Sequence, residues 1–445
     1  MNALDRRIVA LALPALGTLA IEPLYTLVDT AIVGRLGTDP LAGLALAAVV
    51  LSTTVACCNF LAYGTTPRVA GYRGAGQPER AATIAAQALW ICAAIGVPIA
   101  VIIGLAARPI ARLLGGDGAV LDAAVTYLRI SAVGLPFVMV ALVGHGVQRG
   151  LNKLAKPLVI VAVANVVNVI GEVLFVYVFD LGVAGSAWST VIVQIATAVW
   201  FIALLQPQLT MAATRRWLWA EIQPLLAAGR HLIVRVASIT VVFVVSTSVA
   251  ARIDTPTLAA HQIVAQMFLF LALAVDALAI PGQSLVAEAL GAGDRVEAAR
   301  IGRAVMRLSL LTGAGVAAVL AFLSPLAPHA FTGDGAVVSR AAAGLAILAI
   351  LQLPAGITFG LDGVLIGTSD FRFLGRAAAA TAPVAVIGLV AVGTLTPSLG
   401  IAGIWLAQLV WMVTRAATNR HRFAVLLAKD ESTPESRRGA HDLTP

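Results

Sequence analysis

Several carboxylate, amide and hydroxyl side chains lie inside long apolar stretches of this 445-residue chain. Tyr25 and Asp29 are four residues apart in the first stretch and therefore share one face of a helix. Asn165, Asn168 and Glu172 follow a similar helical spacing in a later stretch. If these stretches cross a membrane, a carboxylate near the bilayer centre costs about 2.5–3.5 kcal/mol, so both acids need a reason to be there.

Three further polar residues belong to the same half of the chain. Thr190 and Gln194 are four residues apart, and His145 lies late in another apolar stretch. Together these groups could form a cage in which burial makes a carboxyl group keep its proton, so that proton release is linked to substrate binding. Because hard cations prefer oxygen ligands, Na⁺ is an equally open choice of coupling ion. Its ligands would come from Asp29, Asn168 and Glu172.

A structural explanation competes with each of these assignments. A polar side chain in a membrane helix often makes one helix–helix hydrogen bond, worth about 0.6 kcal/mol, which would account for Asn165, Thr190 or Gln194. Glu22 could pack against an adjacent helix, and His145 could be a solvated histidine near a helix end. Asp29 and Glu172 carry the larger insertion cost, and this favours a functional role for them.

The second half of the chain contains fewer candidates. Asp276 and Asp362 lie within apolar stretches, and Arg235 is a possible counter-ion for them. An Arg–Asp pair that holds two helices together explains these residues as well as a functional role does.

The composition identifies the chain as an integral membrane protein. It is 60% hydrophobic and 12% charged, whereas soluble domains are roughly 45–50% apolar and about 25% charged. The net charge of +8 comes from Lys and Arg residues that are mostly confined to short gaps between apolar runs. This distribution favours membrane loops over a nucleic-acid-binding face. The three cysteines all lie in apolar runs and show no metal-site or disulfide pattern.

Twelve apolar runs are long enough to cross a bilayer, for which about 20 residues are needed. They are 8–33, 41–69, 82–107, 119–148, 156–179, 183–206, 221–250, 258–288, 299–324, 337–366, 374–395 and 399–420. With the N-terminus inside, 22 basic residues fall on the cytoplasmic side and 5 on the other. The excess of basic residues predicts that both termini are cytoplasmic, in a bacterial-type inner membrane.

The two halves of the chain repeat one another at an offset of 217 residues. The segment Gly-Asp-Gly-Ala-Val occurs at 116–120 and again at 333–337, and shorter matches share this offset. Six spans in each half return the chain to its starting side, so the halves should be related by an axis along the membrane normal. We therefore predict an all-α protein of two six-helix lobes, with these parts: lobes 1–206 and 221–428, a cytoplasmic linker 207–220 and a disordered tail 429–445.

Three segments resemble the multidrug and toxic compound extrusion (MATE) family, in particular its DNA-damage-inducible protein F (DinF) branch. Residues 28–34 (VDTAIVG) are similar to the helix 1 motif of that branch, and 361–367 (LDGVLIG), followed by Asp370, are similar to its helix 10 signature. Asn168 and Glu172 resemble the helix 5 pattern, in which the acid is usually Asp. The resemblance covers essentially the whole chain.

The resemblance implies a V-shaped, twelve-helix antiporter that exports cationic or amphipathic compounds as H⁺ or Na⁺ enters. It places five residues at N-lobe positions tied to ion or drug binding: Tyr25, Asp29, Asn168, Glu172 and Thr190. Other branches carry a C-lobe cation site with an acid on helix 7. This chain has Arg235 near the expected place, which argues against a C-lobe Na⁺ site.

Other functions make different demands on the sequence. No phosphate-binding G-x-x-x-x-G-K-[ST] loop is present, so an ion gradient is the expected energy source. A lipid-linked precursor flippase of the same superfamily often has fourteen spans, and a major-facilitator transporter expects a conserved loop motif that residues 67–80 lack. We expect a monomer without enzymatic activity or cofactor, whose partners are the lipid bilayer and small molecules rather than nucleic acid.

Overall fold

A computed structural model describes residues 2–431, apart from the side chains of Glu22 and of residues 427–431. All regular elements within this range are helical, as predicted. The first half contains α1 (Ala3–Gly34), α2 (Thr38–Cys58), α3 (Phe60–Gly74), α4 (Pro78–Leu113), α5 (Gly118–Ala132), α6 (Leu135–Gly150), α7 (Ala155–Val173), the π-helical segment η1 (Leu174–Val178) and α8 (Gly182–Met211).

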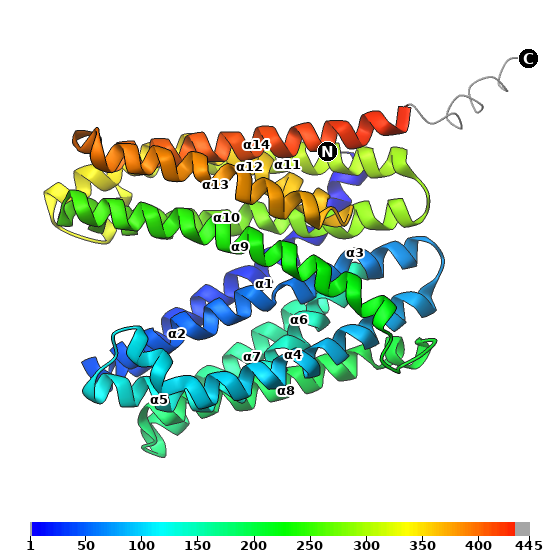
Figure 1. Cartoon of the computed structure of the whole chain (residues 1–445), viewed down its shortest axis with the longest axis horizontal. Helices are drawn as coiled ribbons and strands as arrows, with labels where there is room; N and C mark the ends of the chain where they lie inside the picture. Colours follow the sequence, from blue (N-terminus) through cyan, green and yellow to red (C-terminus); the bar gives the residue numbers. More distant parts are fainter. Residues whose placement is uncertain (1, 432–445) are drawn as a thin grey trace, which may run out of the picture. The chain divides into compact units, whose positions relative to one another are not determined.

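The second half continues the same pattern (Figure 1). It contains α9 (Trp219–Ile253), α10 (Thr255–Gly291), α11 (Arg295–Leu323), the short η2 (Ala327–Ala330), α12 (Gly335–Gly367), α13 (Phe371–Thr394), the short η3 (Pro397–Leu399) and α14 (Gly400–Glu431). Residues 432–445 of the predicted disordered tail 429–445 lie outside the described residues. Residues 429–431 belong to α14, which continues to Glu431.

The helices confirm the predicted all-α membrane fold. Within the described residues, eleven helices are long and apolar enough to span a bilayer, or up to twelve if the bent pair α5 and α6 forms one span. The pair bends by 52°. The break has a local cause, because Pro136 starts α6 and Gly134 before it leaves room for the Gln194 side chain of α8.

The repeated Gly-Asp-Gly-Ala-Val segment has the same structural role in both halves. Asp117 precedes α5, and its side chain accepts a hydrogen bond of 2.8 Å from the Gly118 amide. Asp334 precedes α12 and accepts 2.8 and 3.3 Å bonds from the amides of Ala336 and Val337. Each aspartate satisfies amide groups that have no partner within the helix. The sequence repeat is therefore a repeat of helix starts.

The chain divides into two compact units. We call Leu13–Gly229 the N-terminal unit, and Arg230–Pro445 together with Met1–Ala12 the C-terminal unit. The first twelve residues belong to the second unit because Ile8 and Ala12 pack into one of its cores, and Arg307 forms a 2.5 Å ion pair with Asp5. The helix α1 therefore contributes residues to both units.

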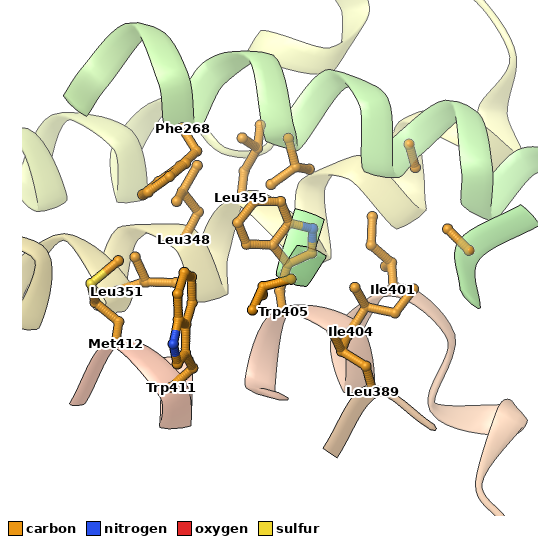
Figure 2. Packing of buried hydrophobic residues seen from close by; sticks show 14 of the residues in the cluster. Phe268, Leu345, Leu348, Leu351, Leu389, Ile401, Ile404, Trp405, Trp411 and Met412 are labelled. Carbon is orange, nitrogen blue, oxygen red and sulfur yellow. The ribbon is translucent and has the colours of Figure 1, made fainter. Parts of the chain in front are cut away.

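The C-terminal unit has a large aromatic core. Figure 2 shows this cluster, to which α10, α12 and α14 all contribute. Trp405 is fully buried, and its ring centroid lies 6.3 Å from that of Phe268. Trp411 is 1% exposed in the same cluster. The bulky rings fill the space between the helices with apolar atoms, and burial of this kind stabilises the unit.

The connection between α8 and α9 is held by α4 of the N-terminal unit. It comprises residues 212–218 and is shorter than the predicted linker of 207–220. Trp90 donates a 2.7 Å hydrogen bond to the Arg215 carbonyl. Gln87 donates a 2.8 Å bond to the Arg216 carbonyl and accepts a 2.9 Å bond from the Leu218 amide. The connection is thus fixed along its main chain.

Candidate functional site

The polar residues predicted in the first half come together on three helices of the N-terminal unit. Tyr25 and Asp29 lie on α1, Asn168 and Glu172 on α7, and Thr190 on α8. Asp29 is 7% exposed, Asn168 5% and Glu172 0%. The spacing of four residues on α1 and on α7 orients each pair toward α8, which supplies their shared partners.

A single hydroxyl group links the two acids. Ser186 Oγ on α8 lies 3.0 Å from Asp29 Oδ1 and 2.7 Å from Glu172 Oε1. Ser186 is fully buried, and within the described residues the other oxygen of Glu172 has no hydrogen-bond partner. A hydroxyl has one hydrogen and can donate to only one of the two carboxyl groups. If Ser186 donates to one carboxyl group, its oxygen can only accept from the other. Both contacts are therefore hydrogen bonds only when that other carboxyl group carries a proton.

A neutral network continues from the acids along α1, α7 and α8. The Asn168 side-chain amide donates to Tyr25 Oη at 3.0 Å and to Thr190 Oγ1 at 3.4 Å. Tyr25 Oη and Thr190 Oγ1 are 3.2 Å apart. Ser189 Oγ lies 3.1 Å from Asn168 Oδ1, to which it donates. The Asn168 amide is therefore held at both ends and presents its NH₂ group to the tyrosine.

Two more tyrosines complete the surroundings of the acids. Tyr127 on α5 is 5% exposed, and its hydroxyl group lies beside Ser186 and Thr190. Tyr177 donates a 2.7 Å hydrogen bond to the Ile32 carbonyl, one turn after Asp29 on α1. Within residues 2–431, no Lys or Arg side chain forms an ion pair with either acid. The acids therefore have hydroxyl neighbours and no fixed positive charge.

Close approach of α7 and α8 brings Ser186 to the acids. The π-helical segment η1 begins two residues after Glu172, and such segments are frequent at functional sites. A Cβ atom on Gly185 would lie 2.7 Å from the Phe175 main chain, and one on Gly171 would lie 2.7 Å from Ser189 Oγ. Glycine at 185 lets α8 touch the main chain of η1, and glycine at 171 leaves room on α7 for the Ser189 side chain of α8.

A cavity of about 190 Å³ adjoins the neutral network. Its polar lining includes Tyr25, His145, Asn165, Asn168, Thr190 and Gln194, with Phe137 and valine or alanine residues as the apolar wall. His145 contacts Phe201 at a ring distance of 4.9 Å, and Asn165 bonds the Val161 carbonyl of its own helix at 2.8 Å. Hence His145, Asn165 and Gln194 face the cavity but do not bond the acids.

The C-terminal unit holds a different kind of cluster. Arg235 of α9 and Arg415 of α14 both donate to Asp362 Oδ2 on α12, at 2.6 and 3.0 Å. Asn419 donates to the other oxygen of Asp362 at 2.8 Å. Asp276 on α10 interacts with Arg415, so two acids face two guanidinium groups. The expected pairing of Arg235 with Asp362 is present. The hydrogen bonds to Asp362 join α9, α12 and α14, and the interaction of Asp276 with Arg415 adds α10.

The sequence analysis missed several of these residues. Ser186 precedes Thr190 by four residues and Gln194 by eight, so a helical stripe on α8 could have revealed it. Arg415, counted among the 22 basic residues on the cytoplasmic side, is 6% exposed and bound to Asp362. Its spacing of four from Asn419 was the available signal. Tyr127 and Ser189 gave no distinctive pattern.

In the described residues of the two units, a metal centre would require several ligand side chains close together. Within residues 2–431, no group of three or more His, Cys, Asp and Glu side chains gathers as metal ligands would. The Glu22 side chain lies outside the described part. Oxygen atoms available to a monovalent ion come from Asp29, Glu172 and Ser186, because Asn168 directs its oxygen to Ser189.

A helical bundle that spans a membrane and buries unpaired acids between its helices defines a polytopic membrane transporter. The family model MatE matches residues 14–174 and again residues 232–392, so the chain belongs to the MatE family. The two matches begin 218 residues apart, in agreement with the internal repeat. The protein is therefore an efflux transporter of a family whose members are transporters rather than enzymes.

Known relatives agree with this assignment. The chain is 30% identical to Protein DETOXIFICATION 44, chloroplastic, of Arabidopsis thaliana, over 95% of this chain and 82% of the relative. It is 27% identical to DNA damage-inducible protein F of Escherichia coli, over 93% and 91%. It is 29% identical to the probable multidrug resistance protein NorM of Synechococcus, over 80% and 78%. The resemblance to the MATE family and to DNA damage-inducible protein F is confirmed.

Solved structures share the fold at low sequence identity. A MOP superfamily transporter from Pyrococcus furiosus superposes with a TM-score of 0.86 at 19% identity, over 96% of this chain and 97% of that one. A MATE protein crystallised in the bent conformation superposes with a TM-score of 0.89 at 19% identity, over 97% and 98%. These likenesses confirm the helical transporter fold.

Proposed function

We propose that this protein is a proton-coupled antiporter that exports cationic or amphipathic compounds and uses Asp29 and Glu172 as its coupling site. The observation that carries the proposal is the single Ser186 hydroxyl between the two buried carboxyl groups, at 3.0 and 2.7 Å. One hydrogen cannot serve two ionised acceptors, and two like charges at close range oppose each other. A shared proton resolves both conflicts.

The shared proton suggests how transport is coupled. A carboxyl pair that holds a proton has less negative charge and is cheaper to keep among apolar helices. When the proton leaves, the full charge attracts a cationic substrate, because neither acid forms an ion pair with a Lys or Arg side chain that the structure describes. Proton and substrate then compete for one site, and this competition is the requirement for exchange.

The adjoining cavity supports an amphipathic substrate. Tyr25, Asn168 and Thr190 belong both to the cavity wall and to the network that leads to the acids. The rest of the wall is mostly apolar, with Phe137 and Val161 among its residues. An apolar pocket with a few polar groups at one side suits compounds with an apolar body and one charged group. Relatives named as probable multidrug resistance proteins support this substrate class.

Sodium is the alternative coupling ion. Its ligands would be oxygen atoms of Asp29, Glu172 and Ser186, and the free oxygen of Glu172 is available to it. The Asn168 amide presents nitrogen rather than oxygen to Tyr25 and Thr190, and its oxygen accepts from Ser189, which favours the proton. The excess of basic residues supports an orientation with both termini in the cytoplasm of a bacterial-type inner membrane. The internal repeat supports two six-helix lobes. We also retain the monomer as part of the proposal.

The C-terminal cluster has a structural role in this proposal. Asp362 is bound by Arg235, Arg415 and Asn419, so it has no free oxygen for a transported ion. Asp276 also faces Arg415. The interaction of the guanidinium groups with both acids makes the cluster close to neutral. The N-terminal unit alone then provides the coupling carboxyl groups.

Proteoliposomes that contain the purified protein test the proposal. Addition of a fluorescent cationic compound on one side should produce proton movement in the opposite direction, with or without Na⁺. Asp29→Asn and Glu172→Gln should each reduce this coupled movement at least about tenfold, or about 1.4 kcal/mol. Asp122→Asn is the matched control, because Asp122 forms an exposed pair with Arg108 in the same unit. Full coupled transport by Asp29→Asn would overturn the assignment of Asp29 to the coupling site. A strict requirement for Na⁺ would show that Na⁺, and not the proton, is the coupling ion.

A further inference from the structure

An apolar groove of about 600 Å³ runs between α12 and α14 of the C-terminal unit, whose contact is visible in Figure 1. Leu353, Pro354 and Ile357 form one wall, and Val413, Ala416 and Ala417 form much of the other. Small alanine side chains on α14 leave the groove open. Among the side chains that the structure describes, Arg420 and His421 are the charged or titratable groups of its lining, and none of the lining residues is an acid.

The groove has a polar end and an apolar end. Arg422 donates a 2.7 Å hydrogen bond to Asp370, which begins α13 just after the end of α12. Asp370 lies just beyond the candidate span that ends at Gly367, and Arg420 and His421 directly precede Arg422, so the polar end of the groove lies near the end of the spans. Leu353 lies fourteen residues before the end of α12, which is about 21 Å at 1.5 Å per residue. The apolar end therefore reaches toward the middle of a hydrocarbon core of about 30 Å.

The polar end has an unbalanced positive charge. Arg420 and His421 are exposed, and within the described residues neither forms an ion pair. The neighbouring cations Arg415 and Arg422 are already bound to Asp362 and Asp370. An occupant with an anionic group at the membrane surface and a long apolar part would complement both ends.

We propose that this groove binds an anionic phospholipid, with one acyl chain along α12 and α14 and the phosphate group at Arg420 and His421. The α14 lining from Val413 to Ala424 extends over eleven residues, about 16 Å, which accommodates much of an acyl chain. Basic pockets between membrane helices recognise anionic headgroups, whereas the ammonium group of a zwitterionic lipid is repelled by unpaired arginine. With the proposed orientation, the lipid belongs to the cytoplasmic leaflet.

Native mass spectrometry of the full chain, extracted from membranes that contain phosphatidylglycerol and phosphatidylethanolamine, tests the proposal. The protein should retain phosphatidylglycerol, and the double variant Arg420→Gln/His421→Gln should lose at least about ninety per cent of it. A variant with the same change in charge, Arg303→Gln/His329→Gln, should retain it, because neither residue lines the groove. Ala417→Trp, which fills the groove without any change of charge, should also lose the lipid.

A second measurement covers a variant that folds poorly. Added phosphatidylglycerol should raise the thermal unfolding midpoint of the unmodified protein by several degrees more than phosphatidylcholine does, because a ligand of the native state stabilises it. Equal retention in the groove variants and the control, equal effects of the two lipids, or displacement of the lipid by a transported compound would each overturn the proposal. These outcomes do not depend on which ion drives transport.

Discussion

The two units carry the same six-helix repeat but bury different chemistry at matching positions. At the repeat offset of 217, Asp29 of the N-terminal unit corresponds to Ser246 and Glu172 to Leu389; Ser186 corresponds to Ile404 at an offset of 218, since the repeat is one residue out of step from residue 181 on. Ile404 is fully buried in the apolar core, and Ser246 accepts a 3.2 Å bond from Gln408. Since the C-terminal unit folds with apolar or neutral residues at these positions, the acid pair is dispensable for the fold. Its presence in one repeat only points to function.

The charged cluster of the C-terminal unit is in turn replaced by residues without a carboxylate or guanidinium group in the N-terminal unit. Asp362 corresponds to His145 in the first repeat at an offset of 217, and Arg415 and Asn419 correspond to Thr197 and Phe201 at an offset of 218. His145 and Phe201 contact each other through their rings, whereas their counterparts form hydrogen bonds to one carboxylate. The carboxylate of Asp362, bound by two cations, holds helices together, whereas the proposed function assigns proton exchange to the carboxyl pair that has no cation. Four substitutions test this difference between the units.

The largest effect on stability is expected from Asp362→Asn. This change leaves Arg235 and Arg415 buried without their common partner, and loss of one member of a buried ion pair costs about 3–5 kcal/mol. Denaturant unfolding in detergent micelles measures the loss. Asp29→Asn is the matched variant in the other unit and should cost far less, because it removes a negative charge that has no cation. A loss below about 1 kcal/mol for Asp362→Asn would contradict the structural role of the cluster.

A smaller loss is expected from Gly185→Ala on α8. The new Cβ would lie 2.7 Å from the Phe175 main chain, so η1 and α8 must separate, at a cost of about 1–3 kcal/mol. The counterpart Gly403→Ala meets the side chains of Leu399 and Val392 at 2.9 Å, which have more freedom to shift. Thermal unfolding and transport should both suffer more in Gly185→Ala. Equal effects of the two variants would show that main-chain contact between η1 and α8 is not essential.

Ser186→Ala should alter the pH dependence of transport. Removal of the hydroxyl leaves Asp29 and Glu172 without their common partner, which we expect to lower efflux about tenfold at neutral pH, or about 1.4 kcal/mol. Ser186→Thr keeps a hydroxyl group and should restore the original pH profile. Ser246→Ala, which removes a buried hydroxyl from the other unit, is the control. An unchanged pH profile in Ser186→Ala would refute the shared proton while leaving the role of the acids intact.

The smallest effect is expected at a helix start outside the membrane spans. Asp254 caps α10 by accepting a 2.6 Å bond from the Thr257 amide, whereas its counterpart Gly37 gives α2 no side-chain cap. Hydrogen bonds from Thr257 hold the pKa of Asp254 below its ordinary value. The cap therefore stabilises the protein above the unfolded-state pKa and is lost as the pH falls through the folded-state pKa. Asp254→Ala should cost about 1 kcal/mol at neutral pH and little in acid, as measured by unfolding.

The fold could be predicted from the sequence because a helix needs about 20 apolar residues to cross the bilayer. Every apolar run of sufficient length became helical, although runs 41–69 and 119–148 each divide into two helices, and the repeated aspartates at 117 and 334 start corresponding helices. The bend between α5 and α6 and the π-helical η1 were not predictable, since both depend on contacts of those segments with α8.

The site was predictable only where a residue type is costly. Asp29 and Glu172 stand out because acids are rare in apolar helices. Ser186 does not, because a serine in a membrane helix can bond its own backbone and needs no partner elsewhere. Arg415 escaped notice because it lies near the end of its span, where arginine is ordinary in a cytoplasmic loop. Its partner on α12 is visible only in three dimensions.

The fastening of residues 212–218 to Gln87 and Trp90 has a practical consequence. A protease needs an extended, mobile segment, and this connection offers none despite its place between the two repeats. Limited digestion of the folded protein should therefore spare it. If the two halves are expressed as separate chains, residues 212–218 should stay with the first half. A cut before residue 212 would leave Gln87 and Trp90 on α4 without their hydrogen-bond partners.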